Sequence, residues 1–131
     1  MKIKVKTNPV VELRQCNNGG DVLKLRREMV YFVGRRAVTV PKGFRCDGMS
    51  VPRALWGLVS PAIHPQTIAA AILHDWLYRT ANHSLTRKQA DWLFFLLMLK
   101  CKFSRWRSAL AYLGVRLFGK KSWAKGREKN V

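Results

Sequence analysis

Acidic residues are rare in this chain, and three of its four aspartates fall in segments that could do chemistry together. The chain has 25 lysines and arginines but only 7 acidic residues. Asp47 lies between two prolines, Asp75 follows His74 directly, and Asp91 lies in a later apolar stretch. An isolated carboxylate inside an apolar segment is costly unless it is paired, protonated or bound to a cation. We therefore expect these acids to be partners of a histidine or ligands of a metal ion.

The spacing of His74 and Tyr78 places both side chains on one face of a predicted helix. Asp91 falls near the start of the next predicted helix, and a short connection makes the two helices antiparallel neighbours. Asp91 can then reach His74, fix its tautomer and strengthen its other ring nitrogen as a base. Asp75 points about 100° away, toward the segment that contains Asp47. Two carboxylates with loop carbonyls are the oxygen ligands that Ca²⁺ prefers.

The same residues also have a structural interpretation. His74 could be a core histidine held by Asp91, and Tyr78 could serve packing alone. Asp75 could instead form an ion pair, because structural ion pairs collect in such places too. Its candidate partners are Arg45, Arg53, Arg79 and Arg87. Spacing alone does not decide between a catalytic and a structural cluster.

The first third of the chain has the pattern of strands. Residues 2–6 alternate lysine with isoleucine or valine, and β-branched or aromatic runs follow at 22–25, 29–33 and 37–40. Turn residues separate these runs. The next segment, bounded by Pro41 and Pro52, is predicted to be an irregular loop of the kind that often carries binding residues.

Three helices are predicted after this loop. The first begins at Pro65, and the second begins near Thr86, where Thr86 and Gln89 could form a capping box, and ends near residue 101. Ser104 could cap the third, which has four apolar residues on one face: Trp106, Leu110, Leu113 and Leu117. The expected fold is α+β, with a small N-terminal antiparallel β-sheet followed by a three-helix region. Residues 1–119 would form a single domain, and 120–131 a basic, flexible tail.

A net charge of +18 is typical of a protein with an anionic partner, which could be an anionic phospholipid membrane, a nucleic acid or an acidic protein. It equally fits a solvated basic surface without a specific ligand, because charge alone selects no partner. Aromatic residues at helical spacings are expected in the core, but some could form an exposed patch beside arginines and lysines: Trp76, Trp92, Phe94, Phe95, Trp106 and Tyr112. Such a patch suits a membrane surface or single-stranded nucleic acid equally well. The sequence does not separate these partners, because it does not give the rotation of each helix.

Other classes of protein have little support in the sequence. The three cysteines show no CxxC spacing, which fits a reduced, cytosolic environment, although a Cys46–Cys101 bridge stays open. No zinc-ligand spacing and no GxSxG motif is present. The N-terminus lacks the apolar region of a signal peptide. The longest apolar run, residues 92–99, is much shorter than the roughly 20 residues of a transmembrane helix, so we expect no transmembrane segment.

Three ordered motifs, VPKGFRCDGMSVPR, HDWLYR and RKQAD, resemble a family of small tailed-phage and prophage proteins of unknown function. The resemblance covers about residues 38–118. It implies a phage or prophage origin, production in the bacterial host cytoplasm and possible association with the virion and its structural proteins. It attaches no activity to the chain.

The helix pair HDWLYR and RKQAD is also similar, over a shorter stretch, to that of phospholipase A2 enzymes. This resemblance implies a hydrolase in which His74 activates a water and Asp91 orients His74, with Tyr78 beside them. It implies that Asp75 binds Ca²⁺, with Asp47 and carbonyl groups near Gly48 completing the metal site and the metal stabilising the oxyanion. The glycine-rich calcium loop usual in these enzymes does not precede the motif. The alternative is a non-catalytic basic virion or assembly protein.

Overall fold

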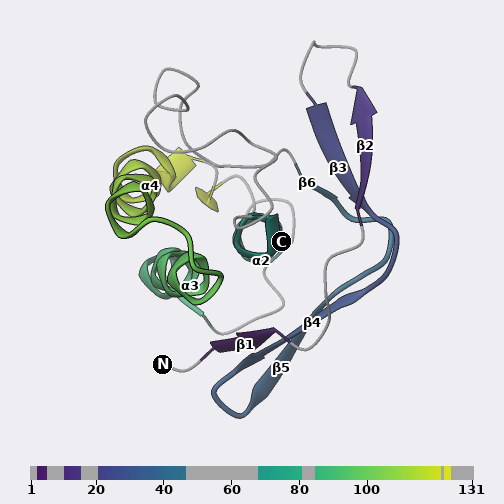
Figure 1. The fold of residues 1–131 in the computed structure, drawn as a ribbon, viewed down its shortest axis with the longest axis horizontal. Helices are drawn as coiled ribbons and strands as arrows, with labels where there is room; N and C mark the ends of the chain where they lie inside the picture. Colours follow the sequence, from purple (N-terminus) through teal and green to yellow (C-terminus); the bar gives the residue numbers. More distant parts are fainter. Residues whose placement is uncertain are drawn as a thin grey trace.

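The computed structural model describes residues 3–5, 11–15, 21–46, 68–80, 85–121 and 123–124. Within these residues, antiparallel strands come first and three helices follow (Figure 1). The strands are β1 (Ile3–Val5), β2 (Val11–Gln15), β3 (Asp21–Leu25), β4 (Met29–Val33), β5 (Arg36–Val40) and β6 (Arg45–Cys46). The helices are α2 (Ile68–Arg79), α3 (Arg87–Lys100) and α4 (Arg105–Phe118). The predicted α+β architecture is confirmed.

The strands form two three-stranded sheets, with the orders β1-β4-β5 and β2-β3-β6. One long, bent hairpin joins them, since β3 leads into β4 and β5 leads into β6 (Figure 1). At the bend, the Leu25 amide donates to the Phe44 carbonyl, and the Gly43 amide donates to the Leu25 carbonyl. At the far end of the hairpin, Gly34 has φ 64° and takes the first place of a two-residue turn, where a type II′ turn requires positive φ.

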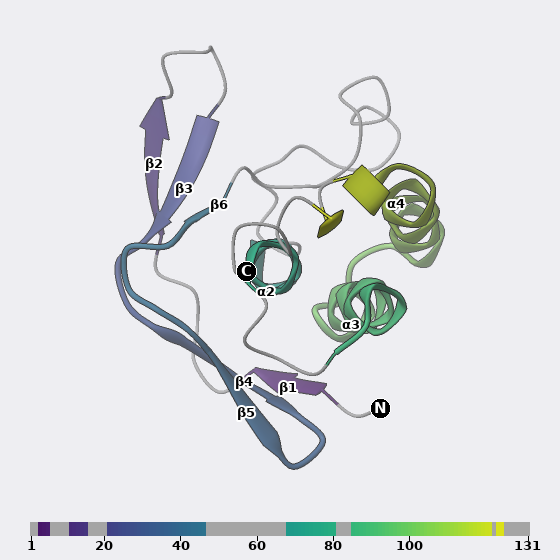
Figure 2. The same ribbon diagram turned by 180° about the vertical axis from the view of Figure 1, so that it is seen from behind.

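Helix α2 is the centre of the molecule, with the sheets on one side and α3 and α4 on the other (Figures 1 and 2). Most of its residues are buried, because it has neighbours on both sides. The small side chains of Ala69, Ala70 and Ala71 allow close approach at its first turn. There the Tyr31 hydroxyl of β4 donates to the Ala69 carbonyl over 2.7 Å and fastens the sheet to the helix.

Sequence signals at both ends of α3 explain where it begins and ends. The Gln89 amide donates to the Thr86 hydroxyl and the Thr86 amide donates to the Gln89 side chain, which confirms the predicted capping box. At the other end, Lys102 has φ 63°, and the amides of Lys102 and Phe103 bond back to Leu99 and Met98. These two bonds form a Schellman motif with lysine at the position that glycine usually takes.

Several boundaries differ from the sequence-based expectations. Strand β2 was not predicted, and Arg45–Cys46 pair with β3 inside the segment expected to be an irregular loop. Ser104 is the N-cap residue of α4, but its side chain makes no capping hydrogen bond. Cys101 is a free thiol. The predicted helix start at Pro65 lies outside the described residues.

The chain after α4 is described at residues 119–121, 123 and 124. Trp123, in the segment expected to be a tail, packs edge-on against Tyr78 with ring centroids 5.2 Å apart. Among the described helices, none is long and apolar enough to cross a membrane.

Candidate functional site

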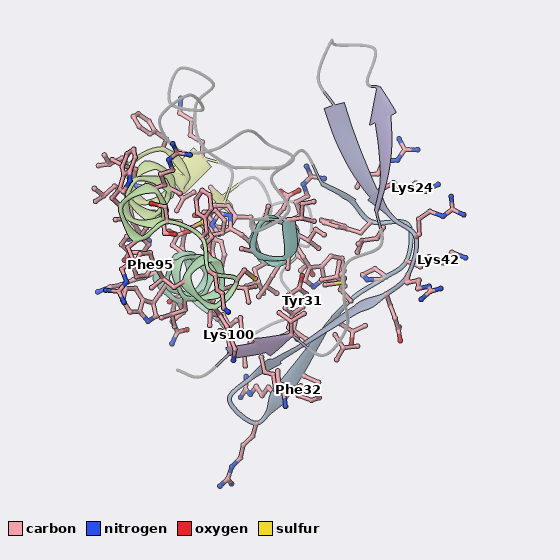
Figure 3. The ribbon with its side chains drawn as sticks, viewed as in Figure 1. Lys24, Tyr31, Phe32, Lys42, Phe95 and Lys100 are labelled. Carbon is pink, nitrogen blue, oxygen red and sulfur yellow. The ribbon has the colours of Figure 1, made fainter. Side chains whose placement is uncertain are left out.

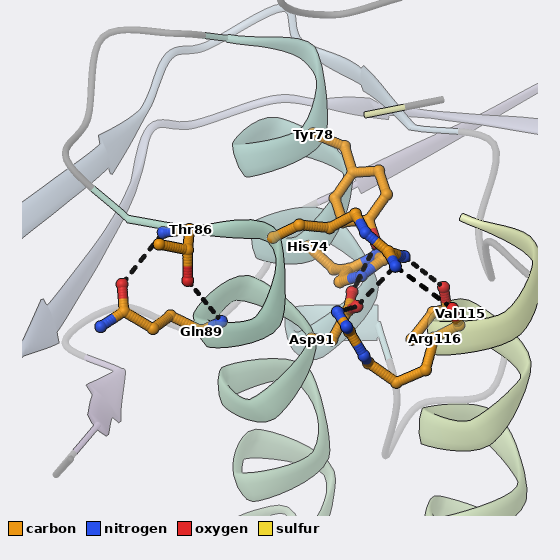
Figure 4. A network of polar contacts seen from close by, with 8 residues as sticks. His74, Tyr78, Thr86, Gln89, Asp91, Val115 and Arg116 are labelled. Atoms are coloured by element: carbon orange, nitrogen blue, oxygen red, sulfur yellow. Dashed lines mark hydrogen bonds and ion pairs between the residues drawn. The ribbon is translucent and has the colours of Figure 1, made fainter. Parts of the chain in front are cut away.

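A buried cluster around the Asp91 carboxylate connects all three helices (Figure 4). His74 and Tyr78 lie on one face of α2, four residues apart, and Asp91 lies in the first turns of α3. His74 Nε2 is 2.7 Å from Asp91 Oδ1, and the Tyr78 hydroxyl donates to the same oxygen over 2.6 Å. The structure therefore brings together the three residues predicted to form the catalytic part of the site.

The cluster is closed off from solvent, with His74 1% and Asp91 0% exposed. The imidazole ring of His74 lies between two aromatic rings, with centroid distances of 4.6 Å to Phe94 and 4.3 Å to Tyr78. These rings fix the plane of the imidazole, and Asp91 fixes its rotation. A histidine held in this way has one defined tautomer and direction.

Two arginines hold the second oxygen of Asp91. Arg116 of α4 donates to Asp91 Oδ2 over 2.8 Å, and Arg87 lies 3.7 Å from the same atom. Arg87 also donates to the carbonyls of Val115 and Arg116 near the end of α4. A guanidinium is favoured there because the C-terminal end of a helix carries partial negative charge. Oδ1 of Asp91 thus bonds the two residues of α2, and Oδ2 lies against the two arginines.

These contacts keep Asp91 ionised. Burial alone raises the pKa of a carboxyl group, but hydrogen bonds from His74, Tyr78 and Arg116 outweigh it and lower the pKa of Asp91 below its ordinary value. An ionised carboxylate only accepts hydrogen bonds, so His74 Nε2 must carry a proton. In the neutral imidazole, the lone pair is then on Nδ1. Nδ1 is the ring nitrogen that can act as a base.

Asp75 takes part in a separate contact, with Arg79, which also reaches β6. Its Oδ1 lies 3.2 Å from Arg79 Nε, and Arg79 also donates to the Arg45 carbonyl over 2.9 Å. Of the partners considered for Asp75, Arg79 forms this ion pair, and Arg53 lies outside the described residues. Arg87 instead lies beside Asp91, and the Arg45 carbonyl accepts from Arg79.

The described residues do not by themselves fit a calcium ion. Ca²⁺ takes six to eight oxygen ligands, whereas here the Arg79 guanidinium already contacts Oδ1 of Asp75 and the Arg45 carbonyl. Among the residues that the structure describes, no three acidic, histidine or cysteine side chains come together as metal ligands. The other two predicted ligand positions, Asp47 and Gly48, lie outside the described residues.

Comparison with known families gives a match over most of the chain. The sequence model described as "Protein of unknown function (DUF1353)" matches residues 23–115. The chain belongs to the DUF1353 family. The matched stretch of this DUF1353 chain contains every predicted site residue and ends one residue before Arg116. No curated protein and no solved structure matches the DUF1353 chain significantly.

Sequence reasoning missed the role of both arginines at Asp91. The pairing of Arg87 with Asp91 could have been predicted, since Arg87 precedes Asp91 by four residues on a helix and ion pairs form at that spacing. The pairing of Arg116 could not, because Arg116 lies 25 residues beyond Asp91 and reaches it only through the packing of α4 on α3.

Proposed function

We propose that this chain is a general-base hydrolase that cleaves an ester bond of anionic phospholipid, with His74 as the base. The observation that supports this most is the contact of 2.7 Å between His74 Nε2 and Asp91 Oδ1. With Nε2 protonated, Nδ1 takes a proton from water as the water attacks the ester carbonyl. The imidazolium then gives this proton to the leaving alcohol oxygen as the acyl–oxygen bond breaks, which releases the acid and restores neutral His74. The Asp91 carboxylate stabilises the imidazolium, and Tyr78 holds that carboxylate in place.

The burial of His74 sets a condition on this proposal. General-base catalysis requires water and the ester carbonyl to reach Nδ1 within hydrogen-bond distance. Because the imidazole is 1% exposed, part of the chain must move to admit them. Arg116 and Arg87 also draw the charge of Asp91 toward Oδ2, which weakens its hold on an imidazolium.

Calcium binding is a separate part of the proposal. Asp75, Asp47 and carbonyl groups near Gly48 would hold Ca²⁺ once Arg79 has left the Asp75 carboxylate. The link from Asp75 through Arg79 to the Arg45 carbonyl of β6 supports this, since Asp47 follows β6 directly in the chain. A phage or prophage origin, synthesis in the bacterial host cytoplasm and contact with virion proteins are likewise proposed, on the three sequence motifs alone.

Hydrolysis is tested with phosphatidylglycerol in mixed detergent micelles and with a soluble short-chain ester. We expect ester cleavage that falls about 10²- to 10⁴-fold in His74→Gln. His74→Gln removes the base and keeps much of the side-chain volume. Lys88→Gln, on the exposed side of α3, is the control that should keep full activity. Cleavage by His74→Gln at the rate of the unmodified protein, or no cleavage of either substrate, contradicts the proposal.

Metal binding is tested by thermal unfolding with EDTA, Ca²⁺, Mg²⁺ and Zn²⁺. A ligand at 100 times its dissociation constant adds about 2.7 kcal/mol of stability. We expect a rise with Ca²⁺ alone that disappears in Asp75→Asn and persists in Arg79→Gln, which removes the competing guanidinium. Equal unfolding temperatures with every metal would end the calcium proposal and leave the role of His74 to be judged by hydrolysis.

The second candidate is a non-catalytic protein that binds nucleic acid. It is favoured by exposed cations along the hairpin of the sheets: Arg26, Arg27, Arg35, Arg36 and Lys42. Figure 3 shows Lys42 and Lys24 on the outer side of the strands, away from the helices. Binding that falls steeply with salt, and that His74→Gln leaves unchanged, would support this candidate. Binding that is absent at low salt would exclude it.

A further inference from the structure

Helix α4 has an apolar stripe that faces away from the core. Trp106, Leu113 and Leu117 are 57%, 53% and 73% exposed, and their spacing of seven and four residues places them on one side of the helix. Ala111 and Val115, which are buried, lie on the opposite side. The helix therefore has two apolar faces, and only one of them is covered by the described part of the protein.

Aromatic side chains extend this stripe across to α3. The rings of Trp92, Phe95 and Tyr112 contact one another, with centroids 5.2 to 5.8 Å apart. Trp92 is 40% exposed. Tyr112 of α4 thus brings the aromatic rings of α3 beside the helix that carries the stripe. Both helices lie on the other side of α2 from the sheets (Figures 1 and 2).

A pocket lies where α3 turns into α4. Its volume is about 460 Å³, and its lining consists of Phe95, Leu99, Lys102, Phe103 and Arg105. Figure 3 shows Phe95 on the outer side of the helices. This lining of three apolar side chains and two cations is complementary to an amphiphilic anion, such as a phosphate headgroup joined to an acyl chain.

Charge around the stripe has one sign. Lys102 and Arg105 are exposed near the first turn of α4, and Lys120 and Lys121 are exposed just beyond its last turn. The sequence contains no acidic residue from position 92 to position 127. An exposed apolar stripe with cations at both ends matches the interface of an anionic bilayer.

We propose that the outer face of α4, with the pocket at its first turn, binds the surface of a membrane rich in anionic phospholipid. The exposed leucines favour lipid over nucleic acid, because bases stack on aromatic rings whereas an aliphatic side chain offers no such surface. The choice of lipid rests in part on the proposed function. Arg116 of the same helix bonds Asp91, so the membrane-binding helix is also in direct contact with the His74 cluster.

The test is co-sedimentation with vesicles of phosphatidylglycerol and phosphatidylcholine, and with phosphatidylcholine alone, in EDTA. We expect binding to the anionic vesicles only. The triple variant Trp106→Ser, Leu113→Ser, Leu117→Ser should weaken it by at least about tenfold. All three positions are exposed, so its unfolding temperature should stay close to that of the unmodified protein. Brominated lipid should also quench the tryptophan fluorescence of the unmodified protein more than that of Trp106→Phe.

A pair of charge variants locates the surface. Lys102→Gln with Arg105→Gln should weaken vesicle binding, whereas Arg36→Gln with Lys42→Gln makes the same change in net charge on the sheets and should leave it within about twofold. Equal weakening by both pairs, or undiminished vesicle binding by the triple variant, overturns the proposal. The proposal is also overturned if the triple variant loses binding to single-stranded DNA to the same degree as it loses binding to vesicles.

The proposals of vesicle binding and of hydrolysis can be refuted separately. Cleavage of the soluble short-chain ester by the triple variant at the full rate, with vesicle binding lost, supports both proposals. Vesicle binding through α4 without cleavage of any ester supports the membrane-binding face and refutes the hydrolase.

Discussion

His74 and Asp91 are 17 residues apart in the chain, yet their side chains meet at 2.7 Å between Nε2 and Oδ1 in the centre of the helical region. The other carboxylate oxygen of Asp91 bonds Arg116 of a third helix. One side chain thus links α2 to α4 through α3. The contact that would orient a catalytic base is also a contact that holds the helices together.

Asp91→Asn should lower the free energy of unfolding by about 3 kcal/mol, because it leaves Arg116 and Arg87 without their buried counter-charge. Chemical denaturation at pH 7 measures this change. Asp75→Asn is the matched control. Its partner Arg79 is 43% exposed, and such ion pairs contribute about 1 kcal/mol or less. Equal losses in the two variants would contradict the central role of Asp91.

Stability at acid pH should depend on Asp91. Its folded-state pKa lies below the ordinary value, so its contribution is complete above the unfolded pKa of about 3.9 and is lost as the pH falls through the folded pKa. The difference in unfolding free energy between the unmodified protein and Asp91→Asn should therefore shrink below about pH 4. A difference that stays constant down to pH 2 would refute the pKa shift.

Tyr78→Phe should cost about 2 kcal/mol at pH 7, since it removes a hydrogen bond to a buried carboxylate. Burial and the Asp91 carboxylate raise the pKa of the Tyr78 hydroxyl. Its contribution is then complete below the unfolded pKa of about 10 and is lost as the pH rises further. Unfolding curves of both proteins from pH 8 to 11 should converge on the alkaline side. Parallel curves would show that the hydroxyl does not titrate on unfolding.

Gly119→Ala should destabilise the protein by about 1 to 3 kcal/mol through overpacking. A Cβ at this position would lie 2.5 Å from the Val115 carbonyl oxygen and 2.7 Å from the Tyr78 hydroxyl. If the hydroxyl is part of the obstruction, the cost should be smaller in the Tyr78→Phe background. A double-mutant cycle measures this coupling, and strict additivity would show that only the backbone contact matters.

Lys102→Gly should stabilise the protein by roughly 0.5 to 1 kcal/mol, because lysine occupies a left-handed conformation at φ 63° that glycine adopts without steric cost. Thermal and chemical unfolding measure the gain. Lys102→Ala is the control, since alanine loses the charge but keeps the steric cost. An equal gain in unfolding free energy for Lys102→Ala would show that the effect comes from loss of the charge.

The local features of the fold could be read from the sequence. Thr86 and Gln89 predicted the start of α3 because both partners of a capping box lie within one helical turn. The run of β-branched and aromatic residues at 29–33 predicted a strand, and the structure forms β4 there with Met29, Tyr31 and Val33 buried on one side. Strand β2 escaped prediction, and its place beside β3 depends on pairing with another segment.

The candidate site likewise combines features that the sequence predicts with features that depend on tertiary packing. The sequence determined that His74 and Tyr78 share a helix face and that Asp91 can reach them, because a helical repeat and a short connection fix those positions. Only the tertiary structure decided that Arg116 joins Asp91 and that Arg79 holds Asp75. The exposure of Trp106 and Leu117 also follows only from the tertiary structure, because the rotation of a helix depends on what packs against its other side.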